Sequence, residues 1–291
     1  MSRGDRIAVN GNLSTSMRNN YGEDGVAEYY LKVGSTYRNP HYPGIRLCLF
    51  SWLNRWWQME QTSISKITLD QIMLFDLACG YGEATVAFIE WCNTGKMLYR
   101  EQRTSGTTPA SSLPPVPRRK GWINPIILGP EFPKPQIAAT DPFTTMAYNE
   151  RTNYPCAELS FEAIAEGRMP EVSVSIVDGS LRTIVLSDPS ETSNEGEQDQ
   201  QIGTQLIEMV VCSFALHLIE NPSSLFALLW QLSMKARWLV ILAPHKKPEI
   251  KNGWGWNKWN IDTWEECEMS HSVGELLLER VHCRVYRSTN L

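Results

Sequence analysis

One stretch constrains the fold of this chain more than any other: the run LFDLACGYGEATVAFIEW at residues 74–91. An apolar segment ends near Asp76, two glycines follow with one residue between them, and the sequence then takes on helical character. Gly80 and Gly82 allow a tight turn and a close approach of the backbone to a ligand, beside the free N–H groups of a helix start. A carboxylate at Asp76 would repel a phosphate and favour a cationic ligand. The stretch therefore predicts a strand, a turn and a helix that together bind a small cofactor.

Further segments have the composition of buried strands in a parallel sheet, because each is short, rich in Val, Ile, Leu or Met, and followed by small or polar residues. They are residues 67–78, 135–142, 206–215 and 236–244. Between the last two, leucines recur at helical spacing after Asn221, whereas the C-terminal tail alternates as a strand does. An alternation of strands and helices predicts an α/β fold with right-handed crossovers.

Composition limits the class of protein. The chain has 291 residues, 42% of them hydrophobic, and a net charge of −5, which argues against a constitutive nucleic-acid coat. Its apolar runs are shorter than the about 20 residues of a membrane helix, and its polar start is unlike a secretory signal. Its 7 cysteines lack the spacing of a metal site. We expect a cytoplasmic protein, with a nuclear location as the alternative, that contains no metal and does not associate with membranes.

Composition also divides the chain into regions. We expect a flexible N-terminus at 1–20, a helical lid or substrate segment at 21–66, and a cofactor-binding domain at 67–291. Within that domain, 93–134 is rich in Ser, Thr, Gly and Pro, and 187–201 is polar and acidic. Both stretches are predicted to be insertions that contribute nothing to the core.

The glycine-rich run resembles a known family motif. Asp76-Leu-Ala78-Cys-Gly80-Tyr-Gly82 is similar to motif I (D-L-G-C-G-x-G) of the class I S-adenosylmethionine-dependent methyltransferases, with Ala78 in place of the first glycine. The resemblance extends from about residue 67 to 245. It implies a Rossmann-like, mostly parallel seven-stranded sheet with helices on both faces, and S-adenosyl-L-methionine as the cofactor.

The resemblance also implies a set of cofactor-binding residues. Asp141, at the end of the second strand, would bind the ribose hydroxyls, and the segment 156–167 would supply the third strand and contacts to the adenine. The separation of Gly82 from Asp141 is long for the family, which the predicted insertion explains. The complete set is Asp76, Ala78, Gly80, Gly82, Glu83, Asp141, Pro142, Phe161, Glu162, Ser213 and Phe214.

The two glycines also allow other interpretations. The two glycines can simply permit close packing between strand and helix. A dinucleotide-binding dehydrogenase requires G-x-G-x-x-G, but the sixth position counted from Gly80 is Thr85, and the Gly-Lys-Ser/Thr of a P-loop is missing. A non-catalytic relative that only binds the cofactor is a further alternative.

Candidates for the reacting side come from two segments. Methyl transfer is an in-line displacement that requires alignment, exclusion of water and an acceptor for a proton. His217, after the fourth strand, is either a general base or a structural residue at the start of a helix. Tyr37 and His41, in the run YRNPH, either face the methyl group from a lid or cap the sheet.

Aromatic and basic residues leave the acceptor open. The run GWGWNKWN at 253–260 is interpreted as a hydrophobic clasp over the sheet edge, with an aromatic substrate wall as the alternative. Abundant Trp and Tyr favour a small-molecule acceptor. The alternative is an RNA methyltransferase, for which Arg118, Arg119 and Lys120 together with the lysines at 246–247 would follow the phosphates.

Overall fold

The computed structural model describes residues 38–66, 71–104, 123–175, 181–185 and 206–291. The predicted flexible N-terminus, Tyr37, Arg118, Arg119, Lys120 and the predicted insertion at 187–201 lie outside the described residues. None of the helices in the described part of the chain combines the length and the apolar character needed to cross a membrane.

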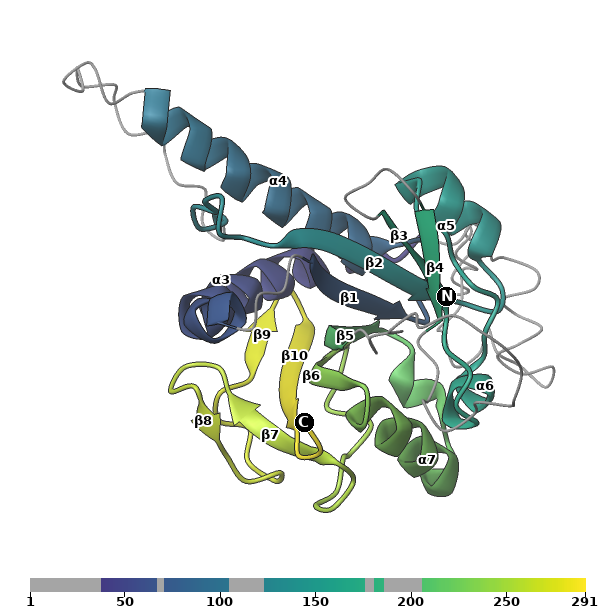
Figure 1. Ribbon diagram of the computed structural model, residues 1–291. Helices are drawn as coiled ribbons and strands as arrows, with labels where there is room; N and C mark the ends of the chain where they lie inside the picture. The colour runs from purple at the N-terminus through teal and green to yellow at the C-terminus, as the bar shows by residue number, and fades with distance from the viewer. Residues whose placement is uncertain (1–37, 67–70, 105–122, 176–180, 186–205) are drawn as a thin grey trace, which may run out of the picture.

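One mixed sheet forms the centre of the described structure, with strands in the order β2-β1-β5-β6-β10-β7-β8 and with β9 paired to β10 (Figure 1). Strands β2, β1, β5 and β6 are parallel neighbours, whereas β10 runs antiparallel to both β6 and β7. The bounds of the strands are Gln71–Leu77 (β1), Lys134–Thr140 (β2), Ile207–Ser213 (β5), Ala236–Ala243 (β6), Trp256–Asn260 (β7), Glu265–Glu266 (β8), Leu276–Leu278 (β9) and Val281–Ser288 (β10).

The α/β fold and the parallel strands match the prediction, but the seven-stranded sheet does not. Among the described residues the sheet has 8 strands, and its half beyond β6 is antiparallel. The expected third strand is reduced to a parallel bridge between Thr140 and Ala157. Pro155 lacks an N–H for a ladder, and Ser160 already begins α6 (Phe161–Ala165) by accepting a hydrogen bond from the Ala163 N–H. A separate hairpin consists of β3 (Glu171–Ser175) and β4 (Leu181–Val185).

Helices cover both faces of the sheet (Figure 1). On one face lie α3 (Tyr42–Lys66) and α4 (Glu83–Thr104), where Trp52 and Trp56 are completely buried among residues of β1, β5 and β6. On the other face, α7 (Pro222–Ser233) buries the leucines predicted from their helical spacing. The remaining helices are α5 (Thr145–Thr152) and the short 3-10 helix η2 (Leu216–Leu218). The segment 21–66 is therefore not a lid throughout, because its helix α3 belongs to the core.

The predicted insertion at 93–134 is also narrower than expected. Helix α4 continues to Thr104, because residues 93–104 contain Met, Leu, Arg, Glu and Gln, which are strong helix formers. Further along, Leu128 and Phe132 are buried in the core on the side of α3 and α4. The expectation that this whole stretch contributes nothing to the core is wrong.

The tryptophan-rich run at 253–260 forms β7 and packs inward. Trp256 is buried and donates from its Nε1 to the carbonyl oxygen of Leu229 on α7, at 2.8 Å. Trp259 lies against Trp238 of β6, with ring centroids 5.6 Å apart. These contacts support the clasp interpretation and not the substrate wall.

Candidate functional site

The strand order reverses direction between β1 and β5, and a cavity of about 380 Å³ opens there at the carboxyl ends of the parallel strands. In open α/β sheets, ligands bind outside the carboxyl ends of the strands at such a switch point. The volume lies within the range of small-molecule sites. We call this space the first cavity.

The backbone is strained where two adjacent strands end at the first cavity. Ala78, directly after β1, has φ 53°, and Phe214, directly after β5, has φ 58°. Residues other than glycine rarely adopt this left-handed region, and strained backbone of this kind costs about 1–3 kcal/mol per residue. Both residues line the cavity. Strain at neighbouring strand ends that share one cavity is typical of a functional site.

The two glycines of the motif have different roles. Gly80 has φ 57° and lines the cavity, and an added Cβ would meet only the Oε2 atom of Glu83, at 3.8 Å. Gly82 has φ 83° and faces α5, where an added Cβ would lie 2.7 Å from the Cγ2 atom of Thr152 and 3.1 Å from the ring of Tyr148. The packing interpretation therefore applies to Gly82, whereas Gly80 borders open space.

Asp141 connects the two turns that border the cavity. Its Oδ2 accepts from the Gly80 N–H at 3.1 Å, and its Oδ1 accepts from the N–H groups of Phe143 at 2.8 Å and Thr144 at 3.0 Å. The carboxylate is 7% exposed and lies in the cavity wall. Asp141 thus fixes the glycine turn after β1 to the turn after β2.

Asp76 lies behind the glycine turn and not in the cavity wall. Its Oδ2 accepts from the backbone N–H of Thr85 at 3.1 Å and from the Thr85 hydroxyl at 2.7 Å, so it holds the start of α4. Complete burial raises the pKa of this carboxyl to about 7, although the hydrogen bonds from Thr85 oppose that shift. Asp76 and Gly82 therefore support the turn from behind.

Apart from these two, the structure brings the predicted cofactor residues together in one cavity wall: Ala78, Gly80, Glu83, Asp141, Pro142, Phe161, Glu162, Ser213 and Phe214. The wall also contains residues that the sequence did not single out, among them Cys79, Leu159, Leu218, Glu220 and Asn221. For Asn221, the sequence Asn-Pro-Ser-Ser is a helix-start pattern that could have indicated a place in the site. Asn221 does begin α7, and its side chain accepts a hydrogen bond from the Ser223 N–H at 2.8 Å. Its position after the fourth strand placed that helix start at the carboxyl end of the sheet.

The charges around the first cavity are acidic. Its wall carries the carboxyl groups of Glu83, Asp141, Glu162 and Glu220, and within the described structure it contains no Lys, Arg or His. Burial raises the pKa of Glu83, and Arg151, 3.4 Å away, opposes that shift. Such a wall favours a cationic ligand and disfavours phosphate groups. The described residues contain no cluster of three or more His, Cys, Asp or Glu that could hold a metal ion.

The segment 38–41 lies across one side of the first cavity. Arg38 lies over the ring of Tyr81 in the glycine turn, 3.2 Å from its centroid. Asn39 lines the cavity and donates from its backbone N–H to the Oε1 atom of Glu83 at 3.3 Å. His41 stacks on Phe214 with ring centroids 4.9 Å apart. The short run before α3 therefore spans from the turn after β1 to the turn after β5.

His217 lies beside the first cavity without lining it. Its ring meets that of His245 edge to face, with centroids 4.9 Å apart. Burial, and then the charge of His245, lower the pKa of His217 to about 4. Its Nδ1 atom is buried and has no hydrogen-bond partner among the described residues. The imidazole is therefore neutral at pH 7, and it connects the loops after β5 and β6.

The fold and the cavity define an α/β protein with a ligand-type cavity at a topological switch point, and comparisons with known proteins add a family. No family model matches the chain. The chain is 37% identical to the uncharacterized protein C17A5.05c of Schizosaccharomyces pombe over 281 residues, which cover 96% of this chain and 95% of that protein. The chain therefore belongs to the family of C17A5.05c.

A solved structure shows a weaker likeness. It is the crystal structure of magnesium protoporphyrin IX methyltransferase (ChlM) from Synechocystis PCC 6803 with bound SAM, which aligns with 94% of this chain and 89% of its own. The identity is 10% and the TM-score is 0.35. A TM-score of this size establishes no shared fold, so the proposals below rest on the residues of this chain.

Proposed function

We propose that the protein is an S-adenosylmethionine-dependent methyltransferase that acts on a small-molecule acceptor. The observation that carries the proposal is the acid-lined cavity at the switch point between β1 and β5, bordered by two strained turns. When bound, S-adenosyl-L-methionine supplies a methyl group on a positively charged sulfur. The carboxyl groups of the wall suit that charge, whereas a phosphorylated dinucleotide would meet electrostatic repulsion.

The cavity residues supply the contacts that a bound nucleoside needs. Asp141 already accepts three backbone hydrogen bonds, two of them on Oδ1, and its Oδ2 keeps one further lone pair for a ribose hydroxyl. Phe161 and Glu162, at the start of α6, offer an aromatic face and an acceptor for an adenine. Gly80 leaves open space beside its backbone. These assignments follow the resemblance to motif I and to the segment after the second strand.

His41 is the residue that we propose on the acceptor side. Burial and the nearby charge of Arg280 lower the pKa of His41, so its imidazole is neutral at pH 7 and can accept a proton. Stacking on Phe214 fixes the ring beside the cavity. His217 and Tyr37 stay further candidates. His41 and His217 both lie outside the cavity wall, but His41 stacks on the lining residue Phe214, whereas the ring of His217 meets that of His245. Tyr37 lies outside the described residues.

Calorimetry with three ligands tests the cofactor. S-adenosylmethionine and S-adenosylhomocysteine should bind with micromolar affinity, about 8 kcal/mol, and NAD should not bind. Replacing Glu162→Gln should lower the affinity for S-adenosylmethionine and for S-adenosylhomocysteine alike, because both carry the adenine that Glu162 is proposed to contact. The matched control is Glu166→Gln, since Glu166 is also exposed and follows the last residue of the same short helix but lies outside the wall. Binding of NAD without S-adenosylhomocysteine would refute the proposal.

Transfer of a labelled methyl group tests the acceptor class. The protein, incubated with methyl-labelled S-adenosylmethionine and a cell extract, should label the small-molecule fraction. Label in the RNA fraction would instead support the alternative, for which the described lysines Lys246 and Lys247 are exposed on the loop after β6. Once an acceptor is found, His41→Ala should lower turnover and leave the affinity for S-adenosylhomocysteine nearly unchanged.

A further inference from the structure

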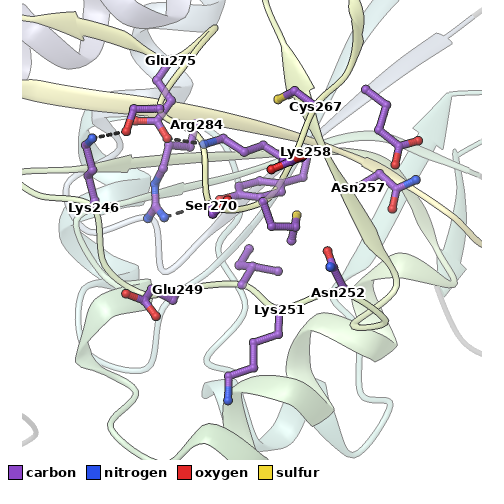
Figure 2. A pocket seen from close by; sticks show the side chains of 16 residues that line it. Lys246, Glu249, Lys251, Asn252, Asn257, Lys258, Cys267, Ser270, Glu275 and Arg284 are labelled. Atoms are coloured by element: carbon purple, nitrogen blue, oxygen red, sulfur yellow. Dashed lines mark hydrogen bonds and ion pairs between the residues drawn. The ribbon is translucent and has the colours of Figure 1, made fainter.

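A second cavity, of about 1040 Å³, lies over the antiparallel half of the sheet (Figure 2). Residues of β7 and β10 form its inner wall, and the loops at 246–252 and 266–275 form its outer wall. It shares no lining residue with the first cavity. On this face α7 packs with residues of β5 and β6, and loops close the sheet over β10 and β7. Over β10 and β7, polar side chains such as those of Lys258 and Arg284 therefore line a cavity and are not covered by a helix of the described structure.

The inner end of the second cavity carries a buried positive charge without a carboxylate partner. Arg284 of β10 is 4% exposed, and its Nη1 and Nη2 donate to the carbonyl oxygens of Pro248 and Lys247, both at 2.8 Å. Its buried Nε has no partner, and the described residues place no carboxylate in ion-pair contact with it. The neighbouring cation differs, because Lys258 is paired with Glu275. A buried guanidinium that only neutral groups solvate is costly, and an anionic group nearby would lower that cost.

The outer end of the second cavity has the opposite balance. Its exposed charged lining residues are three glutamates and two lysines, namely Glu249, Glu266, Glu268, Lys246 and Lys251. Figure 2 shows Lys251 across the pocket from Lys258 and Glu275, whereas Glu249 follows the two residues whose carbonyl oxygens accept from Arg284. Acidic groups thus exceed basic ones at the mouth, while one positive charge is uncompensated inside. The second cavity is therefore positive at its inner end and negative at its mouth.

We propose that the second cavity binds a small zwitterion, with a carboxylate directed toward Arg284 and a cationic amine directed toward the glutamates at the mouth. A ligand with one charge would satisfy only one end. A phosphate ester would be repelled by the glutamates, and a simple amine would gain nothing from the buried guanidinium. Free amino acids and short amino carboxylic acids have the required pair of charges. This site does not depend on the identity of the ligand in the first cavity.

Calorimetric titration with simple probes tests the second cavity. Glycine, 4-aminobutyrate and 6-aminohexanoate carry the same two charges at increasing separation, and acetate and butylamine carry one charge each. At least one zwitterion should bind about tenfold more tightly than both singly charged probes, which corresponds to one charge-assisted contact. The titrations are repeated with saturating adenosine, which lacks the amino-acid zwitterion, so that binding in the first cavity is recognised by competition.

Substitutions locate the bound zwitterion. Glu268→Gln and Glu249→Gln should each lower the affinity for the tightest-binding zwitterion several-fold. Glu265→Gln is the control and should leave that affinity unchanged, because Glu265 is exposed on β8 but lies outside the cavity wall. Both test positions are exposed, so the variants should fold. Arg284→Met should abolish the preference for zwitterions over butylamine, with circular dichroism to verify its folding. Equal binding of acetate and the zwitterions, no binding of any zwitterion to the folded wild type, or an unchanged affinity in both glutamate variants would overturn the proposal.

Discussion

The two cavities are built in different ways, although they lie on one sheet. The first is bordered by short turns at the ends of parallel strands, and backbone N–H groups bonded to Asp141 hold those turns in place. The second rests on the surface of antiparallel strands, and side chains of Arg284 and Lys258 provide its character. The first therefore owes its shape to the backbone, and the second owes its charge pattern to side chains. Substitutions should affect stability most in the first cavity and ligand preference most in the second.

The largest expected effect concerns the buried carboxyl behind the glycine turn. An aspartate in the unfolded chain ionises near pH 4, whereas folded Asp76 holds its proton up to about pH 7. The folded state binds more protons in that window, so ionisation of Asp76 removes roughly 4 kcal/mol of stability as pH rises from 4 to 7. Asp76→Asn keeps an acceptor for Thr85 but does not titrate. Its stability relative to wild type, from urea unfolding, should rise across that window; a constant difference would contradict the burial argument.

The next effect concerns the carboxylate that joins the two turns. Asp141→Ala leaves the N–H groups of Gly80, Phe143 and Thr144 without their acceptor, which should cost about 3 kcal/mol of stability. The affinity for S-adenosylhomocysteine should fall at least tenfold in the variant that remains folded. Urea denaturation and calorimetry measure the two losses. A variant that loses neither would show that the first cavity is not organised by this residue.

The two glycines offer a matched pair with an intermediate effect. Gly82→Ala adds a Cβ against Thr152 and Tyr148 in a left-handed conformation and should lower stability by about 2 kcal/mol. Gly80→Ala adds a Cβ into open space and should cost only about 1 kcal/mol of stability. Gly80→Ala should nevertheless lower the affinity for S-adenosylhomocysteine more than Gly82→Ala does, because the Cβ added at position 80 enters the cavity. Thermal denaturation measures the loss of stability and calorimetric titration the loss of affinity in both variants. A larger loss of stability in Gly80→Ala, or a larger loss of affinity in Gly82→Ala, would contradict the prediction.

The smallest effect is expected at the mouth of the second cavity. Lys246 is exposed and donates to the Ser272 hydroxyl, and exposed contacts of this kind contribute little because water competes for both groups. Lys246→Ala should change the free energy of unfolding by less than about 0.5 kcal/mol. A larger loss, measured by chemical denaturation, would mean that the mouth is structurally required, and the contrast between the two cavities would weaken.

The sequence predicted the parallel half of the structure well because its signals are local. Residues 71–77 form the strand, Gly80 the turn and Glu83 the start of the helix, as the motif indicated. The direction of Asp76 was not predictable, because β1 is buried along nearly its whole length and shows no alternation of polar and apolar residues that would distinguish its faces. The side of β1 on which Asp76 lies, facing Thr85, therefore follows from the strand's geometry in the folded sheet and not from a sequence pattern.

The antiparallel half was harder to predict for a different reason. Its order places β10 between β6 and β7, so the C-terminal strand separates two segments that are neighbours in the sequence. Arg284 meets the carbonyl oxygens of Lys247 and Pro248, which lie far from it along the chain. No local sequence pattern predicts a contact between residues so far apart in the chain. A basic residue in a strand with alternating polarity is instead predicted to be exposed to solvent. The second cavity therefore became visible only in three dimensions.

The contact between His217 and His245 has a consequence for both cavities. Ala215 and Leu218, on either side of His217, line the first cavity, and Lys246, next to His245, lines the second. A ligand that shifts either loop must displace or repack the two imidazole rings, which touch edge to face. Binding free energies are reciprocal, so any change in affinity that one occupant causes at the other cavity is returned in equal size. The ring pair is therefore the contact through which occupation of one cavity would be coupled to the other.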